Sequence, residues 1–432
     1  MTNPLAQPLK LPCGALLNNR IAKAAMSEKL AGPRNESTAQ LEAVYRRWGE
    51  SGAGLILTGN MIVDRRGMEH PGNVAIDTFE DRVALQRLAR AATAGGQHTW
   101  VQLSHCGRQT PIAINPEPLA PSAVRLGTDG LFGMPRPMTE GDILENIART
   151  ARAAQVVREA GFTGVQVHAA HGYLVSQFLS PRTNLREDAW GGSLENRARF
   201  LLELVRAIRT AVGSDFPLSV KLNSSDFQKD GFTLDECKEV VRWLNDESVD
   251  LLEISGGNLE QLVMTGAPAD DNGRVRVRES TKAREAYFLD YAAAVVPVAT
   301  MPLMVTGGFR SRAAMEEALE STGVDVIGLG RPMCADPDLP RRLLDSTVDH
   351  VPSYEHSLAD QYDQEFGRGG GAAAQRGTGV LWFNYQIVAM SEGGSPRVDL
   401  SLTEGLELYT EHDKRVTAAW EGPRYERVTT GR

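Results

Sequence analysis

Eight short runs of β-branched or apolar residues alternate with amphipathic patterns between residues 20 and 346. The runs begin at Ile21, Leu55, His98, Val165, Leu218, Leu251, Leu303 and Val326. This alternation is typical of parallel β-strands joined by crossover helices. Eight units favour a closed (β/α)8 barrel over an open doubly wound sheet. An open dinucleotide-binding sheet would also carry G-x-G-x-x-G after its first strand, and the sequence IAKAAMSEKLAG lacks it. We therefore predict an α/β fold of the TIM-barrel class.

The residues after the last strand pattern form a C-terminal extension. We assign residues 1–350 to the barrel and residues 351–432 to the extension. Within it, the segment EFGRGGGAAAQRGTG predicts a flexible or locally disordered linker, because glycine-rich chains behave as random coils. The apolar segment VLWFNYQIVAM at 380–390 predicts a docked helix. We expect the extension to pack on the barrel or to mediate contacts in a homo-oligomer.

Charge and cysteine content narrow the class of partner. The net charge of −9 without a basic stripe argues against nucleic acid or an anionic membrane, and leaves a small molecule as the expected partner. The four cysteines are far apart and form no C-x-x-C motif, which fits a reducing compartment. The N-terminus resembles no signal peptide, and no apolar run reaches the ~18 residues of a membrane span. We expect a cytoplasmic protein.

Two connections are longer than a barrel requires, at 106–138 and 256–280. The first contains PLAPSAV and GTDGLFGMPRPM, and is predicted to form a loop or hairpin over the C-terminal face of the barrel. Thr139, followed by Asp142 three residues later, predicts a variant capping box at the start of the next helix.

Polar residues at the carboxyl ends of the predicted strands are the candidates for chemistry, because these ends carry the active site of a TIM barrel. They are Ser27, Asn60, Gln102, His105, His168, His171, Lys221 and Ser255. The last two strands end instead in glycine-rich turns, VTGGFRS and GLGRPM. Paired turns of this kind usually cradle a phosphate with backbone N–H groups. We place a phosphate at Gly307, Gly308, Gly330 and Arg331. The alternative is that these glycines only make tight turns.

The histidine pair and Tyr173 allow several interpretations. His168 and His171 are expected to donate hydrogen bonds to a substrate oxygen that gains negative charge, and Tyr173 to supply a proton. A metal site is less favoured because no third ligand is evident. Purely structural roles for the two histidines, and a place on the rim for Tyr173, stay open as well. Lys221 is expected to point into the barrel mouth toward an anionic partner such as a reduced flavin, or otherwise to lie on the rim.

Several segments together resemble the old yellow enzyme family of FMN-dependent ene-reductases. They include NNRIAKAAM, LILTGN, VQLSHCGRQ, PLAPSA, VHAAHGYLVSQFLSPRTNLREDAWGGSLENRARF, VKLNSSDF, EISGG, VTGGFRS and GLGRP. The resemblance covers residues ~5 to 346 and implies a barrel with tightly bound FMN across its mouth. Ser27 would bond the flavin near N5, whereas Gln102 and Lys221 would hold its pyrimidine edge. Family members commonly have arginine in place of Lys221.

The resemblance also implies the reaction. NAD(P)H, bound transiently, would reduce FMN, and an activated alkene would then take the hydride. His168 and His171 match the pair that binds the activating group of the substrate, and Tyr173 matches the proton donor. Two different functions stay open at this point. One is a barrel lyase that acts on a phosphorylated substrate through Lys221 as the nucleophile. The second is a flavin-binding protein without catalytic activity.

Overall fold

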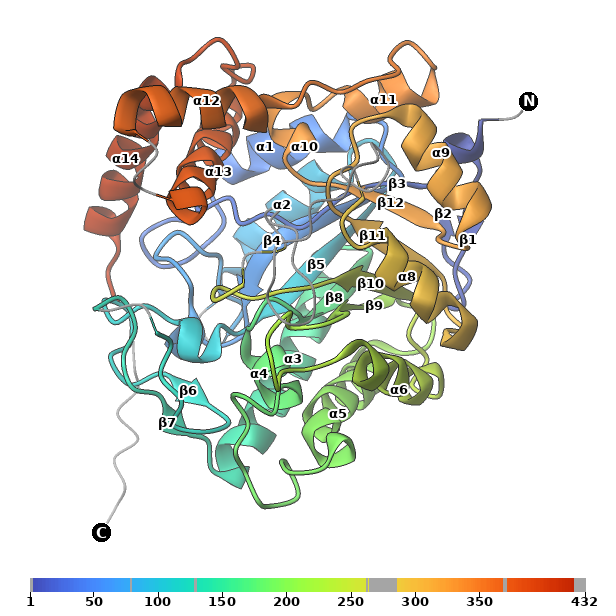
Figure 1. Cartoon of the computed structure of the whole chain (residues 1–432), viewed down its shortest axis with the longest axis vertical. Coiled ribbons are helices and arrows are strands. Elements are labelled where there is room, and N and C mark those ends of the chain that lie inside the picture. The colour runs from blue at the N-terminus through green and yellow to red at the C-terminus, as the bar shows by residue number, and fades with distance from the viewer. Residues whose placement is uncertain are drawn as a thin grey trace.

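Eight parallel strands close into a barrel in chain order (Figure 1). They are β3 (Ile21–Lys23), β4 (Leu55–Ile62), β5 (His98–Ser104), β8 (Gly164–Ala169), β9 (Leu218–Asn223), β10 (Leu251–Ser255), β11 (Leu303–Thr306) and β12 (Val326–Leu329). Strand β12 pairs with β3, with Ile327 opposite Ile21, and so closes the ring. The predicted TIM barrel is confirmed. The computed structural model describes residues 3–77, 80–127, 130–261, 263, 286–367 and 371–422, so most of the predicted connection at 256–280 lies outside the described residues.

Helices follow the strands and cover the outside of the barrel (Figure 1). They are α1 (Ala39–Gly49), α2 (Arg82–Ala92), α3 (Glu140–Ala160), α5 (Leu194–Val212), α6 (Leu234–Asn245), α8 (Leu289–Val295), α9 (Arg312–Ser321), α10 (Pro332–Ala335) and α11 (Leu339–Leu344). Helix α3 begins with the predicted capping box, in which the side chains of Thr139 and Asp142 each accept from the backbone N–H of the other. The helix ends at Gly161, whose φ of 99° suits glycine and stops the helix.

The barrel interior is layered, because alternate residues of each strand point inward. One buried cluster joins Leu57, Trp100, Leu251 and Met304 from four strands. Polar residues of the same strands and of their neighbours are linked to one another beside this cluster. They are Gln102, Gln166, Ser219, Lys221, Glu253 and Thr306. The barrel interior therefore contains an apolar cluster next to a network of polar side chains.

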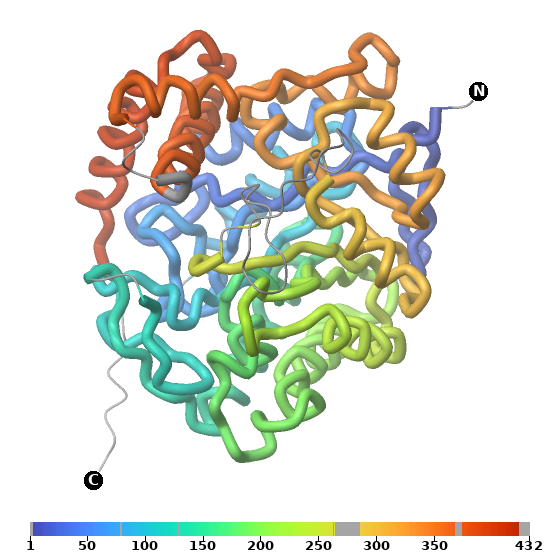
Figure 2. Tube along the Cα trace, viewed as in Figure 1, coloured from blue at the N-terminus to red at the C-terminus, as the bar shows by residue number. Residues whose placement is uncertain are grey.

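The C-terminal extension consists of α12 (Tyr354–Phe366), α13 (Gly371–Ser391) and α14 (Leu402–Ala419). These helices lie together on one side of the barrel, where α13 packs against α1 and α10 (Figures 1 and 2). Trp382 and Ile387 of α13 belong to the main hydrophobic core. Gly405 of α14 leaves the space for Trp382, since a Cβ there would lie 2.4 Å from its ring. The extension thus shares its core with the barrel.

The prediction of a flexible linker is wrong for residues 371–379, which form the first half of α13. Glycine lowers helix propensity by ~1 kcal/mol per residue, but tertiary packing can override this cost. Gln375 supplies part of that packing, since its amide donates to Ala359 O and Asp363 Oδ1 of α12, both at 3.0 Å. The helix predicted at 380–390 is the second half of α13.

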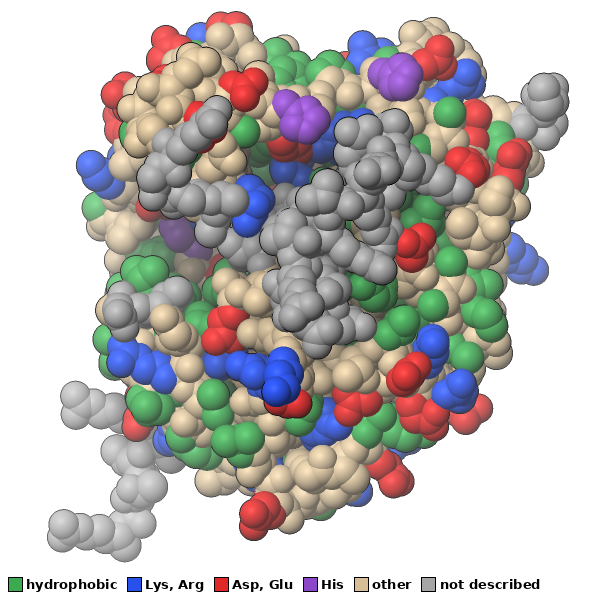
Figure 3. Space-filling view, viewed as in Figure 1, with side chains coloured by type: hydrophobic (Ala, Val, Ile, Leu, Met, Phe, Trp, Pro, Cys, Tyr) green, Lys and Arg blue, Asp and Glu red, His purple; other side chains and the backbone are tan. Residues whose placement is uncertain are grey.

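Charged side chains of both signs are interspersed over the face shown in Figure 3. Among the described residues, no helix is both long and apolar enough to cross a membrane.

Candidate active site

The carboxyl end of β8 carries three of the predicted catalytic side chains. His168 lies in the strand, and His171 and Tyr173 follow in the turn before the short helix α4 (Leu174–Leu179). His171 has a left-handed φ of 61°, and its backbone N–H donates to Asn223 Oδ1 at 3.1 Å. This sharp turn brings the rings together. The centroid of His168 lies 5.1 Å from that of His171 and 4.8 Å from that of Tyr173.

Both imidazoles are neutral hydrogen-bonding groups. Burial, reinforced by the positive charge of Lys221, lowers the pKa of His168 and of His171 well below the ordinary histidine value. The N–H of Ala170 donates to Nδ1 of His168 at 3.2 Å, which leaves the ring proton on Nε2. Nε2 of His171 lies 2.7 Å from Oγ of Ser255. The pair can therefore donate to a substrate oxygen without carrying charge.

Lys221 points into the barrel and is paired with a buried carboxylate. Its Nζ lies 3.0 Å from Oε1 of Glu253, whose side chain is fully buried on the neighbouring strand. Glu253 also accepts from Thr306 Oγ1 at 2.8 Å and from Gln166 Nε2 at 2.9 Å. Gln166 in turn accepts from Gln102 Nε2 at 2.7 Å. A continuous polar chain thus links the two predicted flavin-edge residues, and the rim position for Lys221 is excluded.

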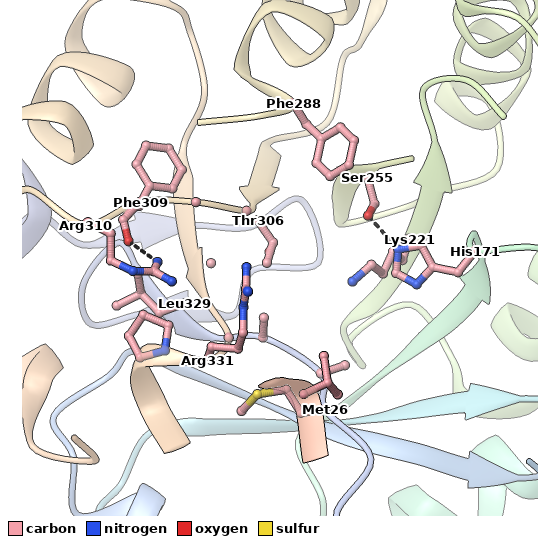
Figure 4. A pocket seen from close by; sticks show the side chains of 18 residues that line it. Met26, His171, Lys221, Ser255, Phe288, Thr306, Phe309, Arg310, Leu329 and Arg331 are labelled. Atoms are coloured by element: carbon pink, nitrogen blue, oxygen red, sulfur yellow. Dashed lines mark hydrogen bonds between the residues drawn. The ribbon is translucent and has the colours of Figure 1, made fainter. Parts of the chain in front are cut away.

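The glycine turns after β11 and β12 line a pocket with a positive end. Figure 4 shows Arg310 and Arg331 on one side of it and Lys221 with His171 on the other. Gly307 and Gly308 have φ values of 136° and 85°, a region that other residues rarely adopt. At Gly330 an added Cβ would have Met26 Sδ as its nearest neighbour, 3.9 Å away, so space is open over this turn.

The extension also reaches this pocket. Val380 of α13 is one of the lining residues. Glu355, in the first turn of α12, forms ion pairs with Arg310 and, at 3.1 Å, with Arg331. Burial alone would raise the pKa of Glu355, but the two guanidinium groups lower it. The two arginines at this end of the pocket are therefore matched by a carboxylate of the extension.

Glu69 joins several of the predicted residues and was not among the candidates from the sequence. Its carboxylate accepts from the hydroxyl of Ser27, from Asn60 Nδ2 at 3.1 Å and from Tyr173 Oη at 2.6 Å. It lies in the loop after β4, where no strand end or periodic pattern draws attention to it. Its proximity to a strand-end asparagine is the one local signal that could have indicated it.

His105 is the predicted strand-end residue that lies apart from this group. Its Nδ1 accepts from the N–H of Gly107 at 3.0 Å, and its ring packs against Gly67. Burial lowers its pKa to about 4, so the ring is neutral. His105 thus belongs to the packing beneath the long connection. Among the described residues, no group of three or more His, Cys, Asp or Glu side chains is arranged to hold a metal ion.

Residues 4–349 match the sequence pattern of the NADH:flavin oxidoreductase / NADH oxidase family. This chain belongs to that family. The result confirms the predicted old yellow enzyme relationship, and with it FMN as the cofactor and NADH or NADPH as the reductant. The protein is therefore a flavin oxidoreductase, which removes the lyase and the non-catalytic flavin-binding protein from consideration.

Relatives from fungi and bacteria agree with this assignment. The chain is 40% identical over 359 residues to the NADH-dependent flavin oxidoreductase nadA of Aspergillus parasiticus, covering 79% of each protein. It is 32% identical over 335 residues to the NADH oxidase of Thermoanaerobacter brockii, covering 76% of this chain but 48% of that protein.

Two solved structures share the fold. A 2-naphthoyl-CoA reductase in complex with 2-naphthoyl-CoA superimposes with a TM-score of 0.72 at 27% identity, covering 80% of this chain and 53% of that one. An old yellow enzyme homologue from Zymomonas mobilis superimposes with a TM-score of 0.68 at 24% identity, covering 81% of this chain and 95% of that one.

The chemistry of the pocket fits FMN. The arginine pair and the open glycine turns suit a phosphate, and the lysine at the opposite side suits the electron-rich edge of a flavin. Oδ1 of Asn60 is buried and meets no hydrogen-bond donor within the described part of the chain. Such an atom is available to a ligand that carries an N–H or O–H group.

Proposed function

We propose that this flavin oxidoreductase reduces activated C=C bonds, in α,β-unsaturated carbonyl compounds and related small molecules, by a ping-pong mechanism. The observation that carries the proposal is the neutral pair of imidazoles beside Tyr173 at the end of β8. Two neutral donors stabilise the negative charge that develops on a carbonyl oxygen when hydride adds to the conjugated β-carbon.

Most of the predicted strand-end residues have a role in this scheme. FMN, when bound, would supply the transfer of a hydride from NAD(P)H to the alkene. Its phosphate would be held by Arg331 and by the backbone of Gly307, Gly308 and Gly330. Its ring system would be held by Ser27, Asn60, Gln102 and Lys221. His168 and His171 bind and polarise the substrate oxygen, and Tyr173 delivers a proton to the carbon α to the carbonyl.

The ligand of one structural relative supports an activated substrate. The 2-naphthoyl-CoA of that complex is a thioester whose carbonyl is conjugated to an aromatic ring system. Such a carbonyl presents the same oxygen to a pair of donors as an enone does. The polar chain from Gln102 to Lys221 supports the assignment of both residues to the pyrimidine edge of the flavin, because hydrogen bonds and an ion pair connect the two side chains in one network.

The phosphate assignment predicts that Arg331→Ala weakens FMN binding by roughly 10- to 100-fold, since a hydrogen bond to a charged group contributes about 1.5–3 kcal/mol. The dissociation constant is measured by titrating apoprotein with FMN and following flavin fluorescence. Arg342→Ala is the matched control, because Arg342 of α11 is half-exposed and pairs with Asp336. Equal affinity of the Arg331→Ala variant and the wild type would place the phosphate elsewhere.

The substrate class is tested with an anaerobic panel against enzyme reduced by NADH. Cyclohexenone, a nitroalkene and a maleimide should restore the yellow flavin absorbance and yield the saturated products. Cyclohexene, which has no activating group, should leave the enzyme reduced. If only oxygen restores the absorbance, the protein is an oxidase and the proposed ene-reduction is wrong.

A further inference from the structure

Glu69 connects Ser27, which is predicted to lie near the flavin, with Tyr173, the predicted proton donor. Its Oε1 accepts from Ser27 Oγ and, at 3.2 Å, from Asn73 Nδ2. Its Oε2 accepts from Tyr173 Oη at 2.6 Å and from Asn60 Nδ2 at 3.1 Å. Four hydrogen-bond donors therefore hold this one carboxylate in place. The reaction scheme proposed above gives Glu69 no role.

We propose that Glu69 and Tyr173 form one proton-transfer unit, in which protonated Glu69 replaces the proton that Tyr173 gives to the substrate. The inference rests on the proposed function. As the C–H bond at the α-carbon forms, the O–H bond of Tyr173 breaks. A new O–H bond forms on Tyr173 as the O–H bond of Glu69 breaks. The β-carbon receives the hydride, and solvent later returns one proton to Glu69.

The geometry requires a coupled step. If Tyr173 gave up its proton while Glu69 was ionised, a tyrosinate and a carboxylate would lie within hydrogen-bond distance of each other in a partly buried site, where their repulsion is stronger than in bulk water. Burial and the negative charge of Glu69 accordingly raise the pKa of Tyr173 well above its ordinary value. An ionised Glu69 that accepts from the hydroxyl of Tyr173 is the arrangement expected after proton delivery.

The surroundings of Glu69 determine how the step depends on pH. Among the described residues, the titratable or charged groups around the pair are Lys29, His70 with its partner Asp413 on α14, Cys106 and His168. Burial alone would raise the pKa of Glu69, but the hydrogen bonds from Ser27 and Tyr173 and the charge of Lys29 lower it. The acid form is thus a minority at neutral pH, and its population rises as pH falls toward that pKa.

The first test is the pH dependence of the oxidative half-reaction, followed by stopped-flow mixing of NADH-reduced holoenzyme with cyclohexenone. In the wild type the rate should fall by about tenfold per pH unit as pH rises above the pKa of Glu69, because the protonated fraction falls by that factor. Glu69→Gln should lose this slope, whereas Glu69→Asp should keep it at a lower rate. Glu36→Gln, a carboxylate of a neighbouring loop, is the control and should behave as the wild type.

The second test needs neither FMN nor turnover. Ultraviolet titration of the apoprotein, compared with the same protein carrying Tyr173→Phe, isolates ionisation of Tyr173. The tyrosine should ionise at distinctly lower pH in the Glu69→Gln background than in the wild type, because the neighbouring negative charge is gone. Equal ionisation in the two backgrounds overturns the proposal, as does an unchanged pH slope in Glu69→Gln. If the titration shows that Glu69 and Tyr173 are coupled but the wild-type enzyme reduces no enone, only the proposed function is refuted.

Discussion

Replacing His168 with alanine is expected to slow reoxidation of the NADH-reduced enzyme by an enone by roughly 10²- to 10³-fold, the usual cost of removing one donor to a developing oxyanion. The reason is that Nε2–H of His168 is one of two neutral donors available to the substrate oxygen. Anaerobic stopped-flow mixing with cyclohexenone measures this rate directly.

The control for this variant is His356→Ala, because the side chain of His356 is exposed on α12. It should leave the rate unchanged. FMN content of the His168→Ala protein should equal that of the wild type, since the flavin assignment involves different residues. If the variant is reoxidised by the enone as fast as the wild type, the histidine pair does not bind the substrate oxygen.

Lys221→Met is expected to lower the free energy of unfolding of the apoprotein by about 3–5 kcal/mol, because it leaves the carboxylate of Glu253 buried without its cation. Urea denaturation measures the change. Adding Glu253→Gln to Lys221→Met should recover much of the lost free energy of unfolding. The neutral amide keeps polar contacts to Gln166 and Thr306 and leaves no buried charge.

The double variant also separates stability from cofactor binding. It should fold well but bind FMN more weakly than the wild type, because no cation remains opposite the flavin edge. A single Lys221→Met variant as stable as the wild type would contradict the buried pair. A double variant with wild-type FMN affinity would contradict the assignment of Lys221 to the cofactor.

The barrel and most of the strand-end residues could be predicted from the sequence, for physical reasons. Strand ends are local features, and parallel strands of a closed barrel bring their carboxyl ends to one face. His168, Lys221 and Arg331 could therefore be placed in one region without any knowledge of their contacts. The same reasoning failed for His105, because a strand-end position alone does not fix whether a side chain points to the site or to the packing beside it.

The acids of the site could not be predicted in the same way. Glu253 stands in the apolar run LLEISG, and only the strand register, which sets it beside Lys221, explains its burial. Glu69 and Glu355 reach the site from a loop and from the extension, through contacts between residues far apart in the chain. The first half of α13 was missed because its glycines weaken the local helix signal, whereas contacts with α12 stabilise it.

The decisive experiment for ping-pong ene-reduction separates the two half-reactions physically. The holoenzyme is reduced anaerobically with one equivalent of NADH, separated from nicotinamide by gel filtration, and mixed with cyclohexenone. A ping-pong ene-reductase should regain its yellow absorbance and release one equivalent of cyclohexanone per bound flavin, with no nicotinamide present. Flavin that stays reduced until air is admitted, with no cyclohexanone formed, would contradict both the substrate class and the proposed roles of His168, His171 and Tyr173.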